Sequence, residues 1–277
     1  MRAIAGLREV APLYDAVVLD QWGVLHDGTA PYPHAADAMA RLAGATRVLV
    51  LSNSGKRADE NRERILRIGL PDVAEAVMTS GEALWRDVAA GRVPMRAPHV
   101  VAGDAASAAR WASGLDLVFA PVEEADSLLL MGLDPAREGE ALAAVAAALA
   151  RGLPVICSNP DHASPRAGGA VAPSPGALAA WAQGRGARVV WYGKPHRPIF
   201  DGATHALGLG PEARILMVGD SPAHDVAGAR GAGWDAALVA GGLHAARLSG
   251  GGAEAAAALC AELAAPEPDW LLEGLRW

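Results

Sequence analysis

Phenylalanine and tyrosine are scarce in this chain of 277 residues, which contains two Phe, three Tyr and 32 Gly. A core with so few of these rings must be built by close packing of small aliphatic side chains. Hydrophobic residues make up 52% of the sequence and charged residues 20%, and this balance excludes an intrinsically disordered chain. A chain of this length can form one large α/β domain or two smaller ones, each with its own core.

The sequence also lacks a run of Lys and Arg, and its formal net charge is -7. Nucleic acids and anionic lipid surfaces bind proteins through clustered positive charge, so neither is an expected partner. No apolar run is typical of a secretory signal, and the Ala-rich stretch at 140–150 is too short to span a bilayer. We therefore expect a cytoplasmic protein that acts on a small molecule.

Cysteine is rare as well. Cys157 and Cys260 are the two cysteines of the sequence, and they form no CxxC pair. This spacing favours buried, reduced thiols over a disulfide framework or a metal site.

Short apolar runs alternate with stretches of helical periodicity. Runs typical of buried parallel strands lie at 15–20, 47–52, 188–192, 215–218 and 236–239. A helix is expected at 34–43, between the first two runs. Strands that alternate with helices predict a doubly wound parallel sheet, and ligands bind such sheets at the carboxyl ends of the strands.

The segment at 80–186 is too long for a single crossover connection and has its own alternation of elements. We expect its strands at 99–102, 127–131 and 154–158 and its helices at 104–113, at 135–150 and from Ser174 onward, where a capping residue precedes Pro. This pattern predicts an α/β domain at 80–186, inserted into a core made of 1–79 and 187–277.

Polar motifs follow the expected core strands in a fixed order. They are Asp20-Gln21-Trp22-Gly23, Ser52-Asn53-Ser54, Gly193-Lys194-Pro195 and Gly219-Asp220 with Asp225. Each motif alone is weak evidence, because a strand-end Asp often caps a helix and Gly-Lys-Pro is common in turns. Because the carboxyl ends of parallel strands meet at one edge of the sheet, the set favours a single phosphoryl-transfer site.

The residue types suit that chemistry. Asp20 can attack phosphorus as a nucleophile if nearby cations offset the charge repulsion, and Lys194 provides one such cation. Carboxylates at Asp20 and Asp220 suit Mg²⁺, which takes few carboxylate ligands and keeps several waters. Asp225 is better placed to orient Lys194 than to bind metal. Ser52 and Asn53 provide a hydroxyl and an amide for phosphoryl oxygens.

The whole pattern resembles the haloacid dehalogenase (HAD) superfamily, and in particular its class IIA branch, which includes nucleotide, sugar-phosphate, phosphoglycolate and pyridoxal-phosphate phosphatases. Further segments share the resemblance, namely Thr79-Ser80-Gly81-Glu82-Ala83, Gly132-Leu133-Asp134, Ser158-Asn159-Pro160-Asp161 and Gly228-Ala229 with Ala232-Gly233. The resemblance implies a Rossmannoid HAD-like core, an inserted α/β cap domain and Mg²⁺-dependent phosphoryl transfer through an aspartyl phosphate.

Carried over to this sequence, the resemblance makes Asp20 the nucleophile, Ser52 the phosphate-contacting hydroxyl, Lys194 the charge-stabilising lysine and Asp220 a metal ligand. It also implies that the main-chain carbonyl of Trp22 binds the metal. Caps of this branch often form dimers, so a homodimer through the cap is a further expectation. Asn159 and Asp161, in the loop at 159–173, are candidates for substrate or hinge contacts, and a simple turn is an equal alternative.

Trp22 departs from the family pattern, which has an acid/base aspartate at this position. A missing acid/base typically costs about 10² to 10⁴ in rate. Three explanations remain open from sequence: His26 or Asp27 replaces the aspartate, the substrate has a good leaving group, or turnover is slow and the role is not hydrolysis.

Two other functions compete with a phosphatase that acts on a small phosphate ester. An aromatic residue at this position is also found in dehalogenases of the superfamily, but their helical cap follows the first motif, where this chain has no space for a domain. A binding or regulatory protein with a defunct site is the second alternative. Metal-dependent turnover of an aryl phosphate separates a phosphatase from both.

Overall fold

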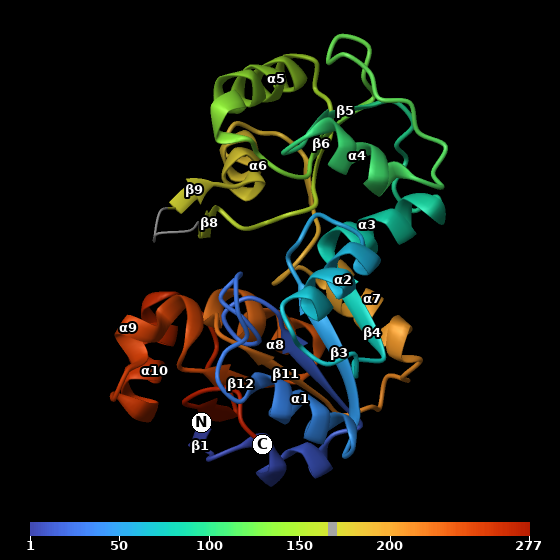
Figure 1. Cartoon of the computed structure of the whole chain (residues 1–277). Helices are drawn as coiled ribbons and strands as arrows, with labels where there is room; N and C mark the ends of the chain where they lie inside the picture. Colours follow the sequence, from blue (N-terminus) through green and yellow to red (C-terminus); the bar gives the residue numbers. More distant parts are fainter. Residues whose placement is uncertain (166–170) are drawn as a thin grey trace. The chain divides into compact units, whose positions relative to one another are not determined.

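The computed structural model describes residues 1–165 and 171–277, and it divides the chain into two compact units (Figure 1). Unit 1 comprises Met1–Ser52, Asp59–Met78 and Lys194–Trp277. Unit 2 comprises Asn53–Ala58 and Thr79–Gly193. None of the helices in this part of the chain is both long and apolar enough to cross a bilayer.

Unit 1 is built on a sheet whose central strands are parallel. Its order is β1 (Arg2–Ala3), β13 (Trp270–Leu272), β12 (Asp235–Val239), β11 (Ile215–Gly219), β2 (Ala16–Asp20), β3 (Arg47–Ser52) and β4 (Ala76–Thr79). The pairs β12–β11, β11–β2 and β2–β3 all run parallel. Every residue of β2 and β11 is buried, which is the pattern of a parallel strand covered on both faces.

Helices surround this sheet (Figure 1). They are α1 (Ala35–Ala43), α2 (Ala58–Arg67), α7 (Arg197–Leu207), α8 (Ala227–Ala232), α9 (Ala245–Leu248) and α10 (Gly252–Glu262). Both α1 and α7 pack against β3, and α8 packs against β12. Helix α7 also packs against α8, and a small residue allows this close approach, as the sequence predicts: a Cβ added to Gly228 would lie 2.3 Å from the ring of Phe200.

Unit 2 has a second parallel sheet, in the order β10 (Val189–Trp191), β7 (Val155–Cys157), β6 (Ser127–Leu130) and β5 (Pro98–Val101). Its helices are α3 (Ser80–Ala89), α4 (Ala105–Ala112), α5 (Glu138–Ala150) and α6 (Pro175–Gln183). A short antiparallel pair, β8 (Ala163–Pro165) with β9 (Val171–Pro173), precedes α6. The apolar core of unit 2 includes Leu128, Leu130, Val145 and Leu178.

The parallel α/β architecture and the inserted α/β domain are confirmed, but one strand assignment was wrong. The run at 188–192, expected in the core sheet, forms β10 and pairs with β7 in unit 2. An apolar run marks a strand without naming its neighbour, so only tertiary pairing decides the sheet. Unit 2 accordingly extends to Gly193 and also includes Asn53–Ala58, unlike the expected bounds of 80–186. Residues 166–170 of the loop at 159–173 lie outside the described residues.

Candidate active site

Asp20 and Lys194 form the centre of a buried polar cluster in unit 1. Asp20 is the last residue of β2, and Lys194 is the first residue of the chain's return to unit 1. Lys194 Nζ donates to Asp20 Oδ1 at 2.5 Å and to Asp225 Oδ1 at 2.7 Å. The backbone N–H of Gln21 donates to the same Asp20 oxygen at 2.7 Å. The lysine therefore bridges two carboxylates that are far apart in the sequence.

Asp220 adds a third buried carboxylate directly after β11. Its Oδ2 accepts a hydrogen bond from the backbone N–H of Leu243 at 2.6 Å. Two glycines enclose this oxygen, because a Cβ added to Gly23 would lie 1.9 Å from it and one added to Gly242 would lie 2.1 Å from it. The orientation of Asp220 thus depends on two loops that approach it closely through glycines.

Asp225 is held in place from two sides. It lies in a single π-helical turn, Pro222–Val226, where Ser221 caps the turn by accepting from the His224 N–H. The Ser221 N–H donates to Asp225 Oδ2 at 3.0 Å, while Lys194 binds Oδ1. Both oxygens of Asp225 are therefore engaged, which agrees with the expectation that this residue orients the lysine.

The protonation states follow from burial and charge. Burial raises the pKa of Asp20 well above its usual value, and Asp225 and Asp220 add to this, although Lys194 lowers it. Burial, with Asp225, raises the pKa of Asp220 to about 7. Burial would lower the pKa of Lys194, but Asp20 and Asp225 outweigh it and raise that pKa. The lysine stays charged, whereas burial disfavours the ionised forms of Asp20 and Asp220 unless a further cation is bound.

This donor set fits a hard divalent cation. One oxygen from each of Asp20, Asp220 and Asp225 lies within 4.8 Å of the other two. Burial and mutual repulsion of these carboxylates is a cost that a bound cation removes. Asp20 Oδ2 accepts no hydrogen bond from the described residues, so this oxygen is available to a ligand or substrate. Carboxylates are the ligands that Mg²⁺ and Ca²⁺ prefer.

Ser52 lies in unit 1, whereas Asn53 and Asn159, whose side-chain amides were predicted to contact the substrate, lie in unit 2. Ser52 ends β3 in unit 1 and is half-buried. Asn53 lies in unit 2, where its Nδ2 donates to Asp161 Oδ1 at 2.7 Å. Asn159 also lies in unit 2, and its Oδ1 accepts from the Asp161 N–H at 3.0 Å. Within unit 2, therefore, the structure brings together the three residues proposed for substrate or hinge contacts.

Trp22 lies beside the turn that follows β2. Its side chain is half-buried, and a Cβ added to Gly28 would lie 3.3 Å from the indole Nε1 and 3.6 Å from Nη2 of Arg64. Arg64 reaches over from α2 and donates to the carbonyl of Gly28 at 3.4 Å. The indole is thus a packing element of the turn and brings no acidic group to the site.

Neither His26 nor Asp27 is in its acidic form near neutral pH. His26 is buried, and its Nδ1 accepts from the Gly28 N–H at 2.9 Å, so the proton of the neutral ring lies on Nε2. Burial, with the charge of Arg64, lowers its pKa to about 4, and the imidazole is therefore neutral. Backbone N–H groups of Ala30 and Thr29 lower the pKa of exposed Asp27, which is ionised.

Sequence reasoning missed the glycine enclosure of Asp220. Gly23 is part of the first motif, but neither Gly23 nor Gly242 was predicted to contact Asp220. The available signal was the pair Gly241-Gly242, which follows the strand β12 at the same sheet edge. A glycine pair at that place is typical of a backbone that approaches another group closely.

Comparison with known proteins supports the same interpretation. A family model described as haloacid dehalogenase-like hydrolase matches residues 17–112, and one described as HAD-hydrolase-like matches residues 191–276. Mouse chronophin (Mus musculus) is 32% identical over 234 residues, which cover 80% of this chain and 79% of chronophin.

Two crystal structures extend the likeness to the fold. A haloacid dehalogenase-like hydrolase from Brucella suis has a TM-score of 0.80 and 27% identity, and the match covers 98% of this chain and 99% of that one. The second structure is glycerol phosphate phosphatase from Mycobacterium tuberculosis, which was solved with calcium and also with magnesium. Its calcium complex matches this chain with 25% identity and a TM-score of 0.69, and the match covers 84% of this chain and 68% of that one.

The fold, the carboxylate cluster and these matches together define a hydrolase of phosphoric monoesters. The chain belongs to the haloacid dehalogenase-like hydrolases, in their class IIA branch.

Proposed function

We propose that this protein hydrolyses a small phosphorylated metabolite through a covalent phosphoryl group on Asp20, with Mg²⁺ as cofactor. The observation that carries the proposal is the hydrogen bond of 2.5 Å between Lys194 Nζ and Asp20 Oδ1 in a buried cluster with Asp220 and Asp225. A buried carboxylate beside a fixed cation and a metal-binding carboxylate is equipped for attack on a phosphate ester.

In the first step, Asp20 Oδ2 attacks phosphorus and the ester oxygen leaves. Lys194 holds the other Asp20 oxygen and offsets charge that builds on the phosphoryl group. The Ser52 hydroxyl donates to a phosphoryl oxygen. Asp20, Asp220 and the Trp22 carbonyl would hold the Mg²⁺, which when bound offsets the negative charge of the carboxylates and of the phosphoryl oxygens. In the second step, water attacks phosphorus and releases Asp20.

Trp22 sets the limits of this reaction. None of Trp22, His26 and Asp27 is suited to protonate the leaving oxygen, because Trp22 carries no acidic group, His26 is neutral and Asp27 is ionised near neutral pH. A substrate with a good leaving group therefore fits the site best. The attack of water is also slowed, because the side chain of Trp22 cannot take a proton from it. The phosphoryl group should accumulate on Asp20.

This accumulation gives the test of the proposed function. With Mg²⁺ and an aryl phosphate such as p-nitrophenyl phosphate, we expect a rapid burst of one phenolate per active site, followed by slow turnover. Quenched-flow absorbance measures the burst, and intact mass spectrometry of the quenched protein detects the added phosphoryl group. A chelator should remove both signals.

Other outcomes identify the alternative functions. Release of halide from a haloacid in the presence of chelator, without a burst, would indicate a dehalogenase. Binding of phosphorylated metabolites with neither burst nor turnover would indicate a regulatory protein with a defunct site. The expected contacts of Asn53 and Asn159 with substrate, and a homodimer through unit 2, stay predictions.

Replacing Gly23 with Ala is expected to weaken Mg²⁺ binding roughly 10- to 100-fold, the range found when a group that orients a metal ligand is changed. The new Cβ would lie 1.9 Å from Asp220 Oδ2, so the carboxylate must move. The Mg²⁺-dependent rise of the melting temperature measures the binding without any need for activity.

Gly69→Ala is the matched control for this substitution. Gly69 has φ of +93° against +87° for Gly23, but nothing lies within 4 Å of its added Cβ. Both variants therefore carry a similar left-handed backbone penalty of about 1–2 kcal/mol, and only Gly23→Ala should lose Mg²⁺ affinity. Equal affinities in the two variants would show that Asp220 does not bind the metal in this orientation.

A further inference from the structure

The loop after Ser52 belongs to unit 2, although Ser52 itself ends a strand of unit 1. The chain passes from one unit to the other between Ser52 and Asn53, and again between Gly193 and Lys194. Each of these crossings lies next to a side chain that the proposed reaction uses. The short loop Asn53–Ala58 is thus joined directly to Ser52, and its conformation bears on the peptide bond that follows Ser52.

Contacts within unit 2 hold this loop along its whole length. Asn53 Nδ2 donates to Asp161 Oδ1 at 2.7 Å. The Gly81 N–H donates to the Ser54 carbonyl at 3.0 Å. The Thr79 hydroxyl donates to the Lys56 carbonyl at 2.5 Å. Two of these bonds join the loop to Thr79 and Gly81 at the start of α3, and the third joins it to Asp161.

Glycine packing leaves the loop little freedom to shift. A Cβ added to Gly81 would lie 2.1 Å from the carbonyl oxygen of Gly55, and one added to Gly55 would lie 2.5 Å from the carbonyl oxygen of Met131. Gly193, before the other crossing, is equally confined, since its added Cβ would lie 2.5 Å from Ser80 Oγ. The segment Thr79–Gly81 thus contacts both crossings.

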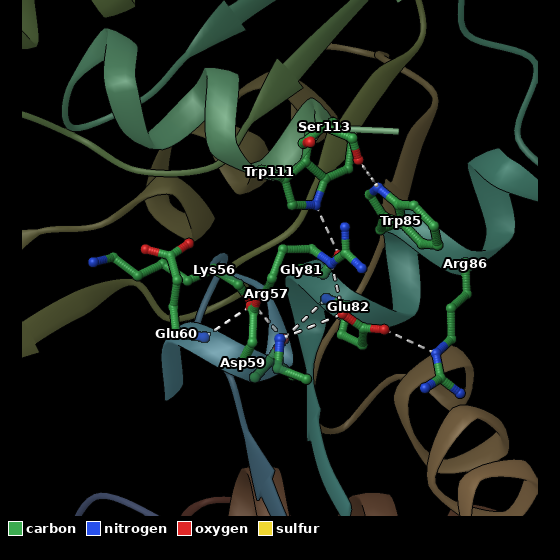
Figure 2. Close-up of polar contacts among 12 residues, drawn as sticks. Lys56, Arg57, Asp59, Glu60, Gly81, Glu82, Trp85, Arg86, Trp111 and Ser113 are labelled. Carbon is green, nitrogen blue, oxygen red and sulfur yellow. Dashed lines mark hydrogen bonds and ion pairs between the residues drawn. The ribbon is translucent and has the colours of Figure 1, made fainter. Parts of the chain in front are cut away.

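Glu82 supplies the charged part of this attachment (Figure 2). Its Oε2 accepts from Arg57 Nε at 2.6 Å and from the Ala58 N–H at 3.3 Å. Its Oε1 accepts from Arg86 Nε at 3.0 Å, one turn further along α3. Burial raises the pKa of Glu82, but hydrogen bonds from Arg57 and Arg86 outweigh this and hold it below its usual value.

The side chain of Glu82 does not make the hydrogen bond that is usual for a glutamate at this position of a helix start. Thr79 caps α3 by accepting from the Glu82 N–H at 2.9 Å. In such a T-x-x-E pattern the glutamate usually bonds back to the N–H of the capping residue. Here both of its oxygens accept hydrogen bonds from other groups, and Oε2 accepts from Arg57 and Ala58 of the loop. The start of α3 therefore lacks the hydrogen bond from the Thr79 N–H to Glu82, and Glu82 binds Arg57 instead.

Arg57 is fixed by a second contact. Its guanidinium carbon lies 3.8 Å from the centroid of the Trp85 ring, and Trp85 Nε1 donates to the Ser113 carbonyl at 3.0 Å (Figure 2). Trp111 in α4 donates to the Gly81 carbonyl at 2.8 Å and supports the same helix start. An arginine that is stacked and ion-paired in this way has little rotational freedom.

We propose that Arg57 is a positioning residue, which through its ion pair with Glu82 fixes the Asn53–Ala58 loop on α3 and so holds the Ser52 hydroxyl where it meets the phosphoryl group. This inference rests on the proposed function, because it concerns the same reaction. Arg57 acts through Ser52 and need not touch the substrate.

The chain offers a matched pair of variants for the test. Arg57→Gln and Arg86→Gln each remove one of the two arginines bound to Glu82 and leave the other in place, but only Arg57 comes from the loop. We expect Arg57→Gln to lower kcat about 10- to 100-fold with KM little changed, because small misplacement of a group at the transition state costs this much. We expect Arg86→Gln to stay within about twofold of the native kcat, since it leaves the loop attached.

A double-mutant cycle with Ser52→Ala separates positioning from a general loss of structure. If Arg57 acts through Ser52, Arg57→Gln should cost less than about twofold in a Ser52→Ala background. Full additivity of the two losses, or equal kcat losses in Arg57→Gln and Arg86→Gln, would overturn the proposal. If Arg57→Gln is unfolded at the assay temperature, Arg57→Lys takes its place in both comparisons, because it keeps the charge but loses the planar stacking group.

Burst measurements on the native protein and on Asp20→Asn separate a failure of the proposed function from a failure of the proposal for Arg57. A native burst that Asp20→Asn abolishes supports the proposed function, and the Arg57 comparisons are then decided by kcat. If the native protein gives no burst and no turnover, the proposed function fails, and with it the reaction in which Arg57 is said to act.

Discussion

Replacing Asp20 with Asn is expected to lower metal-dependent phosphatase turnover by roughly 10⁴-fold or more, and to remove the covalent phosphoryl adduct. The carboxamide has nearly the same shape as the carboxylate but is a very poor nucleophile. Lys194 keeps its bond to Asp225 Oδ1 at 2.7 Å, so the cluster should stay assembled. Steady-state kinetics with an aryl phosphate and mass spectrometry of the quenched protein measure the two effects.

Asp220→Asn is the control for a simple loss of buried charge. It also removes one carboxylate from the buried cluster, but it leaves the nucleophile in place and should weaken metal binding instead. Higher Mg²⁺ concentration should therefore restore part of the activity of Asp220→Asn and none of the activity of Asp20→Asn. Burst formation by Asp20→Asn would contradict the assignment of the nucleophile.

Converting Trp22 to Asp is expected to raise kcat/KM for alkyl phosphates by about 10² to 10⁴, the usual contribution of a positioned acid. The gain for aryl phosphates should be much smaller, because a phenolate leaves without protonation. The aspartate can also deprotonate the attacking water, so the burst with aryl phosphates should disappear. Kinetics with a matched alkyl and aryl substrate, and quenched flow, measure these effects.

Trp22→Asn provides the comparison for this gain. It removes the indole from beside Gly28 in the same way and introduces a side chain of similar size that cannot transfer a proton. Equal gains in Trp22→Asn and Trp22→Asp would show that the indole blocks the site sterically. Equal gains for alkyl and aryl phosphates in Trp22→Asp would show that a missing acid is not what limits turnover.

Local patterns were sufficient for much of the fold and for the centre of the site. Apolar runs predicted β2, β3, β11 and β12, and the order of motifs predicted that Asp20, Lys194 and Asp220 would meet at one edge. For Asp20 and Asp220 this succeeded because the carboxyl ends of parallel strands in one sheet lie side by side whatever the length of chain between them. Lys194 follows β10 of the other sheet, so the same rule does not explain its place in the cluster. The strands β1 and β13 were missed, and the two residues of β1 are too few to show a strand pattern.

The sequence by itself determined the class of fold, the buried carboxylates and the absence of an acid at Trp22, because strand periodicity and residue chemistry are local properties. The tertiary structure alone decided that β10 joins the second sheet, that Gly23 and Gly242 enclose Asp220, and that Asn53–Ala58 is attached to α3 through Arg57 and Glu82. Those features depend on which distant backbones approach each other, and such approaches are set by packing that no short stretch of sequence contains.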